Sequence, residues 1–147
     1  MPIIRPADAA DIEELVALDH AARASSERRA FIGRSISHGA CQVGTLDGRP
    51  VGYIILEYTF FENGFISLLY VAEGSRRRGI GAALIRHVER TCRTPKLFTS
   101  ANASNAPMRR LLLGLGFQPS GVVENLDEND PELLFFKRLS EGATVPE

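Results

Sequence analysis

The strongest signal in the chain is a glycine- and arginine-rich segment, Val71-Ala72-Glu73-Gly74-Ser75-Arg76-Arg77-Arg78-Gly79-Ile80-Gly81-Ala82. It follows the apolar run Phe65–Val71, which predicts a central strand buried on both faces, and it leads into the helical pattern Gly79–Arg93. The first turn of a helix has free backbone N–H groups and the positive end of the helix dipole, and both attract phosphate oxygens. Gly79 and Gly81 have no Cβ atom, so a ligand can approach the backbone closely there. The arginines add positive charge beside the site. The segment therefore predicts a phosphate-binding loop.

Other phosphate loops fit this segment less well. A Walker A loop requires a lysine directly after its last glycine, and Ala82 stands there instead. A dinucleotide fingerprint requires a small residue at the position of Leu84, and its glycines follow the strand more closely. The remaining alternative is an ordinary glycine-rich connection flanked by solvated arginines. The coincidence of a strand, the RxxGxG spacing and a helix favours the phosphate-binding interpretation.

Periodicity and turn residues predict the other elements of the chain. Asp47-Gly48 and Glu62-Asn63-Gly64 are the expected turns, and Asp8 is the expected N-cap of the first helix. The other helical patterns cover Glu27–His38, Gly79–Arg93 and Ala106–Leu115. The expected strands are Ile3–Arg5, Cys41–Thr45, Val51–Tyr58, Phe65–Val71, Leu97–Ser100, Gln118–Val123 and Leu133–Arg138. The order βααβββαβαββ predicts an α/β fold, a mixed sheet with helices on both faces.

Composition narrows the class of protein. The 147 residues include 44% hydrophobic and 24% charged residues, which is typical of one soluble domain, expected here over residues 1–139 with a loose tail at 140–147. The net charge of −1 argues against a nucleic-acid partner, and no apolar run is long enough to span a membrane. No signal peptide is recognisable, so we expect a cytoplasmic protein. The two cysteines and three histidines are scattered, and no metal site is expected.

The motif Arg76-x-x-Gly79-x-Gly81 resembles the acetyl-CoA signature of the GCN5-related N-acetyltransferases, the GNAT superfamily. The resemblance continues through Asn102, Asn105 and Leu115-Gly116-Phe117, and the order of elements matches from Ile3 to Leu139. It implies a mostly antiparallel sheet of about seven strands flanked by about four helices. It also implies transfer of the acetyl group of acetyl-CoA to a primary amine, by direct attack in a ternary complex.

The same resemblance implies which residues hold the cofactor. Backbone N–H groups of Arg77–Ala82 would bind the pyrophosphate, and Leu69–Val71 would pair with the pantetheine arm where this strand, bulged in the family, diverges from Leu97–Ser100. An N–H near Val71 would polarise the thioester carbonyl. Asn105 would reach the cofactor, although it also suits a simple N-cap. The expected cofactor-binding residues are Leu69, Tyr70, Val71, Arg76, Arg77, Arg78, Gly79, Ile80, Gly81, Ala82 and Asn105.

Acid–base residues are harder to assign. Related enzymes often place a tyrosine general acid at the position of Leu112, and a glutamate or histidine base at the positions of Phe65 or Ser67. This chain has neither the tyrosine nor the base, so water-mediated deprotonation is the leading interpretation. The candidate catalytic residues are Ser67, Glu57 and Tyr70.

Two segments are candidates for the acceptor side. The acidic segment Glu124–Glu132 is either a solvated loop or a funnel for a cationic acceptor, in which Asp127 and Asp130 would bind substrate. Phe60–Gly64 is a second candidate, whose aromatic side chains either pack on substrate or cover the sheet. We expect a small-molecule or peptide amine as partner, and a homodimer as in many relatives. The alternative function is a non-catalytic acyl-CoA-binding sensor or scaffold module.

Overall fold

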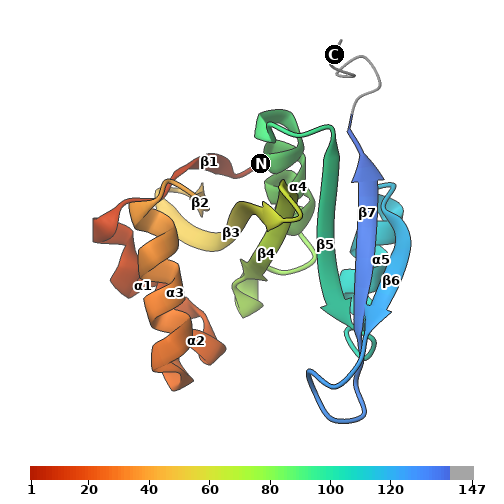
Figure 1. Ribbon diagram of the computed structural model, residues 1–147. Helices are drawn as coiled ribbons and strands as arrows, with labels where there is room; N and C mark the ends of the chain where they lie inside the picture. Colours follow the sequence, from red (N-terminus) through yellow and green to blue (C-terminus); the bar gives the residue numbers. More distant parts are fainter. Residues whose placement is uncertain (140–147) are drawn as a thin grey trace. The chain divides into compact units, whose positions relative to one another are not determined.

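The computed structural model describes residues 1–139, and it contains five α-helices and one sheet of seven strands in the order β1-β2-β3-β4-β5-β7-β6 (Figure 1). The strands are β1 (Ile3–Pro6), β2 (Cys41–Leu46), β3 (Arg49–Phe60), β4 (Asn63–Val71), β5 (Lys96–Asn102), β6 (Gln118–Val123) and β7 (Glu132–Arg138). The helices are α1 (Ile12–Leu18), α2 (His20–Ala24), α3 (Ser26–Ser37), α4 (Ile80–Thr91) and α5 (Ala106–Gly114), with short 3-10 turns η1 (Ala9–Asp11) and η2 (Glu73–Ser75). The pairing of β4 with β5 is parallel, whereas β5 with β7 and β6 with β7 are antiparallel. The predicted mixed α/β sheet is confirmed.

The described chain consists of two compact units. Met1–Leu56 and Leu68–Val88 form the N-terminal unit, and Glu57–Ser67 with the chain from Glu89 onward forms the C-terminal unit. Strands β3 and β4 contribute residues to both units. The expected extent of a single domain, 1–139, stays a prediction, and the expected tail at 140–147 lies outside the described residues.

Helices cover both faces of the sheet in the N-terminal unit. Tyr53 of β3 is fully buried in a core formed with α1, α2 and α3. The neighbouring Gly52 points to the opposite face, because successive strand residues alternate. There an added Cβ would lie 3.3 Å from a methyl group of Leu84 in α4. Helix α4 therefore packs closely against a flat, glycine-bearing part of β3.

A short helix that the sequence did not predict, α2, begins directly after Asp19. Helix α1 ends at Leu18, and the side chain of Asp19, fully buried, caps α2 by accepting bonds from the N–H groups of Ala21 and Ala22. It also accepts hydrogen bonds from Arg28 and from the hydroxyl of Tyr53. A buried carboxylate requires such donors. The structure thus has one more helix than the predicted order, because the turn at Asp19 brings those donors together.

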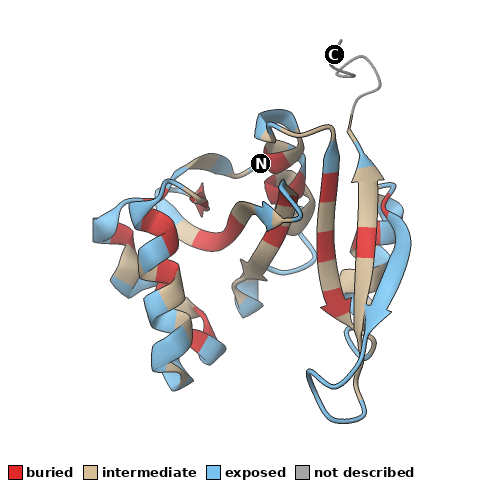
Figure 2. Cartoon of the chain, in the orientation of Figure 1, coloured by how far each residue is buried: buried red, intermediate tan, exposed pale blue. Residues whose placement is uncertain are grey.

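In the C-terminal unit, one face of the sheet is packed and the other is partly open. Along β5, buried and half-buried residues alternate, whereas β6 is exposed along its whole length (Figure 2). Leu97 of β5, Phe135 of β7 and Leu112 of α5 are buried, and α5 lies along β6 and β7 (Figure 1). Phe98 and Phe136, which are register partners, are half-buried on the other face.

Two expectations for β4 are wrong. The turn predicted at Glu62-Asn63-Gly64 lies one residue earlier, because Phe61 and Glu62 have the positive φ angles and β4 already begins at Asn63. Gly64 is required for packing instead, since an added Cβ would lie 2.6 Å from the Sγ atom of Cys92. The run Phe65–Val71 is also not buried on both faces: Ile66 is its one buried residue, and the other six are half-buried.

Candidate active site

The predicted phosphate-binding loop connects β4 to α4 through η2. Arg77 has a φ of 64° and Gly79 a φ of 77°, so the chain turns twice through the left-handed region before the helix begins. The N–H of Ala83 donates to the carbonyl of Gly79 over 3.0 Å. The preceding N–H groups, those of Ile80, Gly81 and Ala82, therefore have no partner within the helix. They are three of the six backbone N–H groups, those of Arg77–Ala82, that the sequence predicted to bind a pyrophosphate.

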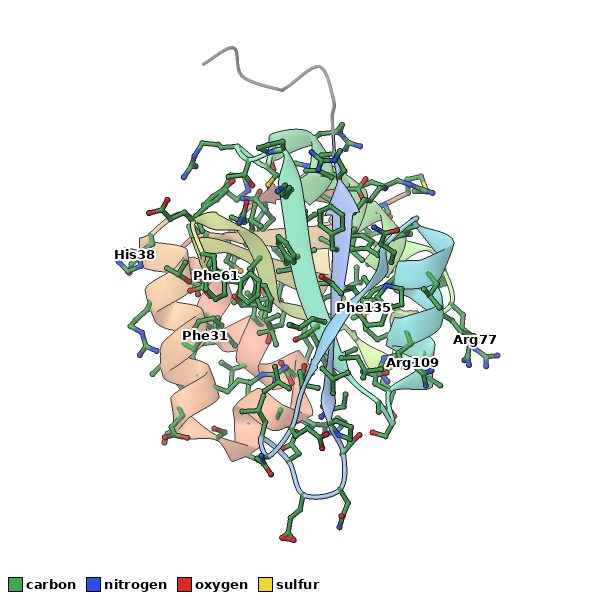
Figure 3. The ribbon with its side chains drawn as sticks, turned by 45° about the vertical axis from the view of Figure 1, so that its right-hand side comes forward. Phe31, His38, Phe61, Arg77, Arg109 and Phe135 are labelled. Carbon is green, nitrogen blue, oxygen red and sulfur yellow. The ribbon has the colours of Figure 1, made fainter. Side chains whose placement is uncertain are left out.

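Arg76 fastens this loop to the strand that precedes it. Its Nε atom donates to the carbonyl oxygen of Val71 over 2.9 Å, and its guanidinium carbon lies 5.3 Å from the ring centroid of Tyr70. Arg77 and Arg78 are exposed, and Figure 3 shows Arg77 pointing away from the ribbon. The unpaired helix N–H groups and the two exposed guanidinium groups suit a ligand with several negative oxygens, such as a pyrophosphate.

Two of the three candidate catalytic residues meet in the C-terminal unit. Ser67 of β4 donates a hydrogen bond from Oγ to the carboxylate of Glu57 in β3, and both residues are half-buried. The third, Tyr70, lies in the N-terminal unit with its ring centroid 6.2 Å from that of Tyr53. The hydroxyl of Tyr70 is buried and has no hydrogen-bond partner among the described residues. Glu57 and Ser67 therefore form a hydrogen-bonded carboxylate–hydroxyl pair, and the Tyr70 hydroxyl has no acceptor within residues 1–139.

The residues around α5 have clear structural roles. Leu112, at the position where relatives often have a tyrosine, is fully buried and provides no hydroxyl group. Asn105 is the N-cap of α5, because its Oδ1 atom accepts a hydrogen bond of 3.2 Å from the N–H of Met108. The side chain of Asn105 is exposed, so capping leaves it accessible to a ligand.

The carboxylates of the acidic segment bind neighbouring parts of the protein. Asp127 accepts a hydrogen bond of 2.8 Å from Asn102, at the end of β5. Asp130 accepts two from Ser104, of 3.0 Å from its N–H and 2.6 Å from its hydroxyl. These bonds hold the β6–β7 loop against the β5–α5 connection. Sequence reasoning missed Ser104, because nothing local relates it to a carboxylate twenty-six residues later.

Known proteins resemble this chain over most of its length. Residues 10–117 match the model of the acetyltransferase (GNAT) family. A GNAT-family acetyltransferase from Bacillus cereus ATCC 10987 is 34% identical, with a TM-score of 0.88, over 94% of this chain and 97% of that one. The protein yncA from Salmonella typhimurium, solved with its cofactor acetyl-CoA, is 19% identical, with a TM-score of 0.77, over 99% and 98% of the two chains. The ribosomal-protein-S18-alanine N-acetyltransferase of Escherichia coli is also 19% identical, with a TM-score of 0.77, over the full length of both chains. Among proteins with curated functions, none matches the sequence.

The family match and the 34% identical relative, which agree with the sheet order and the loop at α4, place the chain in the acyl-CoA-dependent acetyltransferase class. The chain belongs to the GNAT family of acetyltransferases. Acetyl-CoA is its cosubstrate, and the chemistry of the α4 loop fits the pyrophosphate of that molecule. None of the helices within residues 1–139 is long and apolar enough to cross a membrane.

Proposed function

We propose that this protein is an N-acetyltransferase that moves the acetyl group of acetyl-CoA to a primary amine by direct attack in a ternary complex. The observation that carries the proposal is the set of unpaired N–H groups of Ile80, Gly81 and Ala82 beside the exposed Arg77 and Arg78. In the reaction the amine nitrogen bonds to the acetyl carbon and the carbon–sulfur bond breaks. The amine loses a proton, and coenzyme A leaves as the thiol.

The cofactor is bound by the loop and by the end of β4. The N–H groups at the start of α4 hold the pyrophosphate, and Arg77 and Arg78 neutralise its charge. Backbone groups of Leu69–Val71 pair with the pantetheine arm, and the exposed Asn105 provides a further contact. An N–H group of this strand near Val71 polarises the thioester carbonyl, because only a hydrogen-bond donor stabilises the negative charge that develops on its oxygen.

Glu57 removes the proton from the attacking amine, with Ser67 or a water molecule as the relay. The Ser67 hydroxyl is hydrogen-bonded to the Glu57 carboxylate, and Ser67 precedes the stretch Leu69–Val71 by two residues on the same strand. Tyr70 is the candidate general acid, because its buried hydroxyl has no hydrogen-bond partner within residues 1–139. A strong acid is not essential, since a thiol with a pKa of about 8.5 is a good leaving group.

Asp127 and Asp130 attract a cationic acceptor, either a small molecule or a peptide amine, through their charge. Their hydrogen bonds to Asn102 and Ser104 fix both carboxylates in one loop, where their negative charge would attract a cation. The neighbouring Glu124 and Glu128 are exposed and add to the negative potential.

A second candidate function is a non-catalytic acyl-CoA sensor, favoured by the burial of Leu112 where relatives often have a tyrosine. An assay of thiol release from acetyl-CoA with aliphatic, aromatic and amino-acid amines distinguishes the enzyme from the sensor. Acetyl-CoA binding is measured in parallel by calorimetry. We expect turnover, and a loss of about a hundredfold in kcat with unchanged binding for Glu57→Gln. Tight binding without turnover on any amine would favour the sensor, and absence of binding would exclude both.

A further inference from the structure

We propose that the acceptor is a primary amine carried by an aromatic or similarly flat apolar group, and that it binds on the open sheet face of the C-terminal unit. This inference rests on the proposed N-acetyltransferase function and names its substrate class. It is argued from two rows of side chains that cross the strands on that face.

The first row is aromatic. The ring centroids of Phe60 and Phe65 lie 4.9 Å apart, those of Phe60 and Phe98 5.1 Å apart, and those of Phe98 and Phe136 5.3 Å apart. These four rings come from β3, β4, β5 and β7, and all are half-buried. Phe61, which is 82% exposed, extends the row with an edge contact of 5.0 Å to Phe60 (Figure 3 labels Phe61).

This aromatic row does not belong to the packed core of the unit. The core lies on the other face, where Leu97 is fully buried and Phe135 is 3% exposed. Phe61 also occupies a left-handed position, with a φ of 52°, which a bulky residue adopts only at a cost. Apart from its edge contact with Phe60, the Phe61 ring is left in solvent, and it keeps this position at a backbone cost. An apolar ligand that binds on the aromatic row would pack against the exposed ring of Phe61.

The second row is polar and acidic. Phe65 pairs with Phe98 in the parallel register of β4 and β5, and two residues further along these strands are Ser67 and Ser100. Because side chains alternate, both serines lie on the same face as the phenylalanines, about 7 Å further along the strands. Ser67 donates to Glu57, and Ser100 donates to Glu132 over 2.7 Å.

These two carboxylates have no basic partner. None of the ion pairs within residues 1–139 includes Glu57 or Glu132. On this face the two carboxylates, which have no basic partner, lie about 7 Å from the aromatic row. A short carbon chain spans a distance of this size. A protonated amine joined by such a chain to an aromatic ring complements both rows. A polyamine or an aminoglycoside would leave the phenylalanines without a partner.

The test compares kcat/KM for 2-phenylethylamine and putrescine in the wild-type protein and in three variants. Phe61→Asn removes the exposed ring while placing at that turn a residue that tolerates its backbone conformation. Phe98→Leu shortens the centre of the row, and Leu113→Asn removes an exposed apolar side chain from α5 as a matched control. Thermal unfolding checks that all variants are folded.

We expect 2-phenylethylamine to be preferred by about tenfold or more. Phe61→Asn and Phe98→Leu should raise its KM several-fold without changing the KM for acetyl-CoA, and Leu113→Asn should change neither. Turnover that favours putrescine, or folded Phe61 and Phe98 variants with unchanged KM, would overturn the inference while leaving the N-acetyltransferase function intact. If no amine is acetylated, the proposed function fails and the inference fails with it.

Discussion

Arg76 donates a hydrogen bond of 2.9 Å from Nε to the carbonyl oxygen of Val71, the last residue of β4. The first arginine of the motif thus acts on the protein itself, and closes the loop onto the strand from which the loop departs. We expect the positive charge that meets a phosphate to come mainly from Arg77 and Arg78, because Arg76, although also exposed, uses its Nε atom on the carbonyl of Val71. Arg76 therefore holds the conformation of the loop, whereas Arg77 and Arg78 attract the phosphate. Substitutions at these neighbouring positions can test the two roles separately.

Arg76→Gln and Arg78→Gln should therefore differ. Loss of the Arg76 contact should lower the free energy of unfolding by about 0.5–1 kcal/mol and weaken acetyl-CoA binding at any ionic strength. Arg78→Gln should leave stability unchanged and weaken binding by about fivefold, or about 1 kcal/mol, mainly at low salt. Denaturant unfolding and calorimetry at two salt concentrations measure both effects. Identical salt dependence in the two variants would contradict the division of roles.

Gly81→Glu should weaken acetyl-CoA binding by about thirtyfold or more. A carboxylate in the first turn of α4 would occupy the phosphate site and compete for its N–H groups, with a loss of about 2 kcal/mol or thirtyfold from charge alone. The helix itself should not be destabilised, because an acidic residue is favourable in a first turn. Gly33→Glu is the control, since Gly33 lies in α3 with open space around its Cβ position. Normal affinity in a folded Gly81→Glu protein would exclude the loop as the cofactor site.

The two roles of Asn105 can be separated by a pair of substitutions. Asn105→Ala should cost about 1 kcal/mol of stability, because the cap on the N–H of Met108 is lost. Asn105→Asp retains the cap, but its negative charge should raise the KM for acetyl-CoA if the side chain contacts the cofactor. Thermal unfolding and initial rates distinguish these effects. An unchanged KM in the aspartate variant would leave Asn105 as a helix cap alone.

Gly52→Ala should destabilise the N-terminal unit. The new Cβ would lie 2.8 Å from the carbonyl oxygen of Tyr70 and 3.3 Å from Leu84, so the backbone of β4 or helix α4 must move. Overpacking of this kind costs about 1–3 kcal/mol. Gly33→Ala, at an open helical position, should instead stabilise the protein by about 0.5–1 kcal/mol. Urea unfolding of both variants measures the contrast, and equal stabilities would show that β4 accommodates the methyl group.

Acid should weaken the protein through Asp11. Hydrogen bonding from Arg5 holds the pKa of the Asp11 carboxyl below its ordinary value, against the opposing effect of burial. Since the folded-state pKa is depressed, this stabilisation is complete above the unfolded-state pKa of about 3.9 and is lost as the pH falls through the folded-state value. Asp11→Asn should be less stable at pH 6 by about 1.5 kcal/mol and should lose less stability on acidification. Unfolding midpoints of both proteins between pH 6 and pH 2 test this prediction. If the midpoints of the wild type and of Asp11→Asn fall in parallel with pH, other carboxylates cause the acid sensitivity.

The sequence by itself determined the glycine- and arginine-rich loop between a strand and a helix, the turn at Asp47-Gly48 and the order of the strands along the chain. These features depend on contiguous residues: the segment from Val71 to Ala82 contains its own strand end, glycines and helix start. Backbone conformation and free N–H groups are local properties, so spacing alone predicts them. The absence of a hydroxyl group at Leu112 was equally readable from the sequence.

Only the tertiary structure decided which distant side chains meet. Asp19 lies between α1 and α2, where Arg28 and Tyr53 bind its buried carboxylate, and Gly64 is required by the sulfur of Cys92 rather than by a turn. The pairing of Glu57 with Ser67, like the aromatic row across four strands, follows from strand register. Register is set by the packing of whole faces, and no single segment of the sequence contains it.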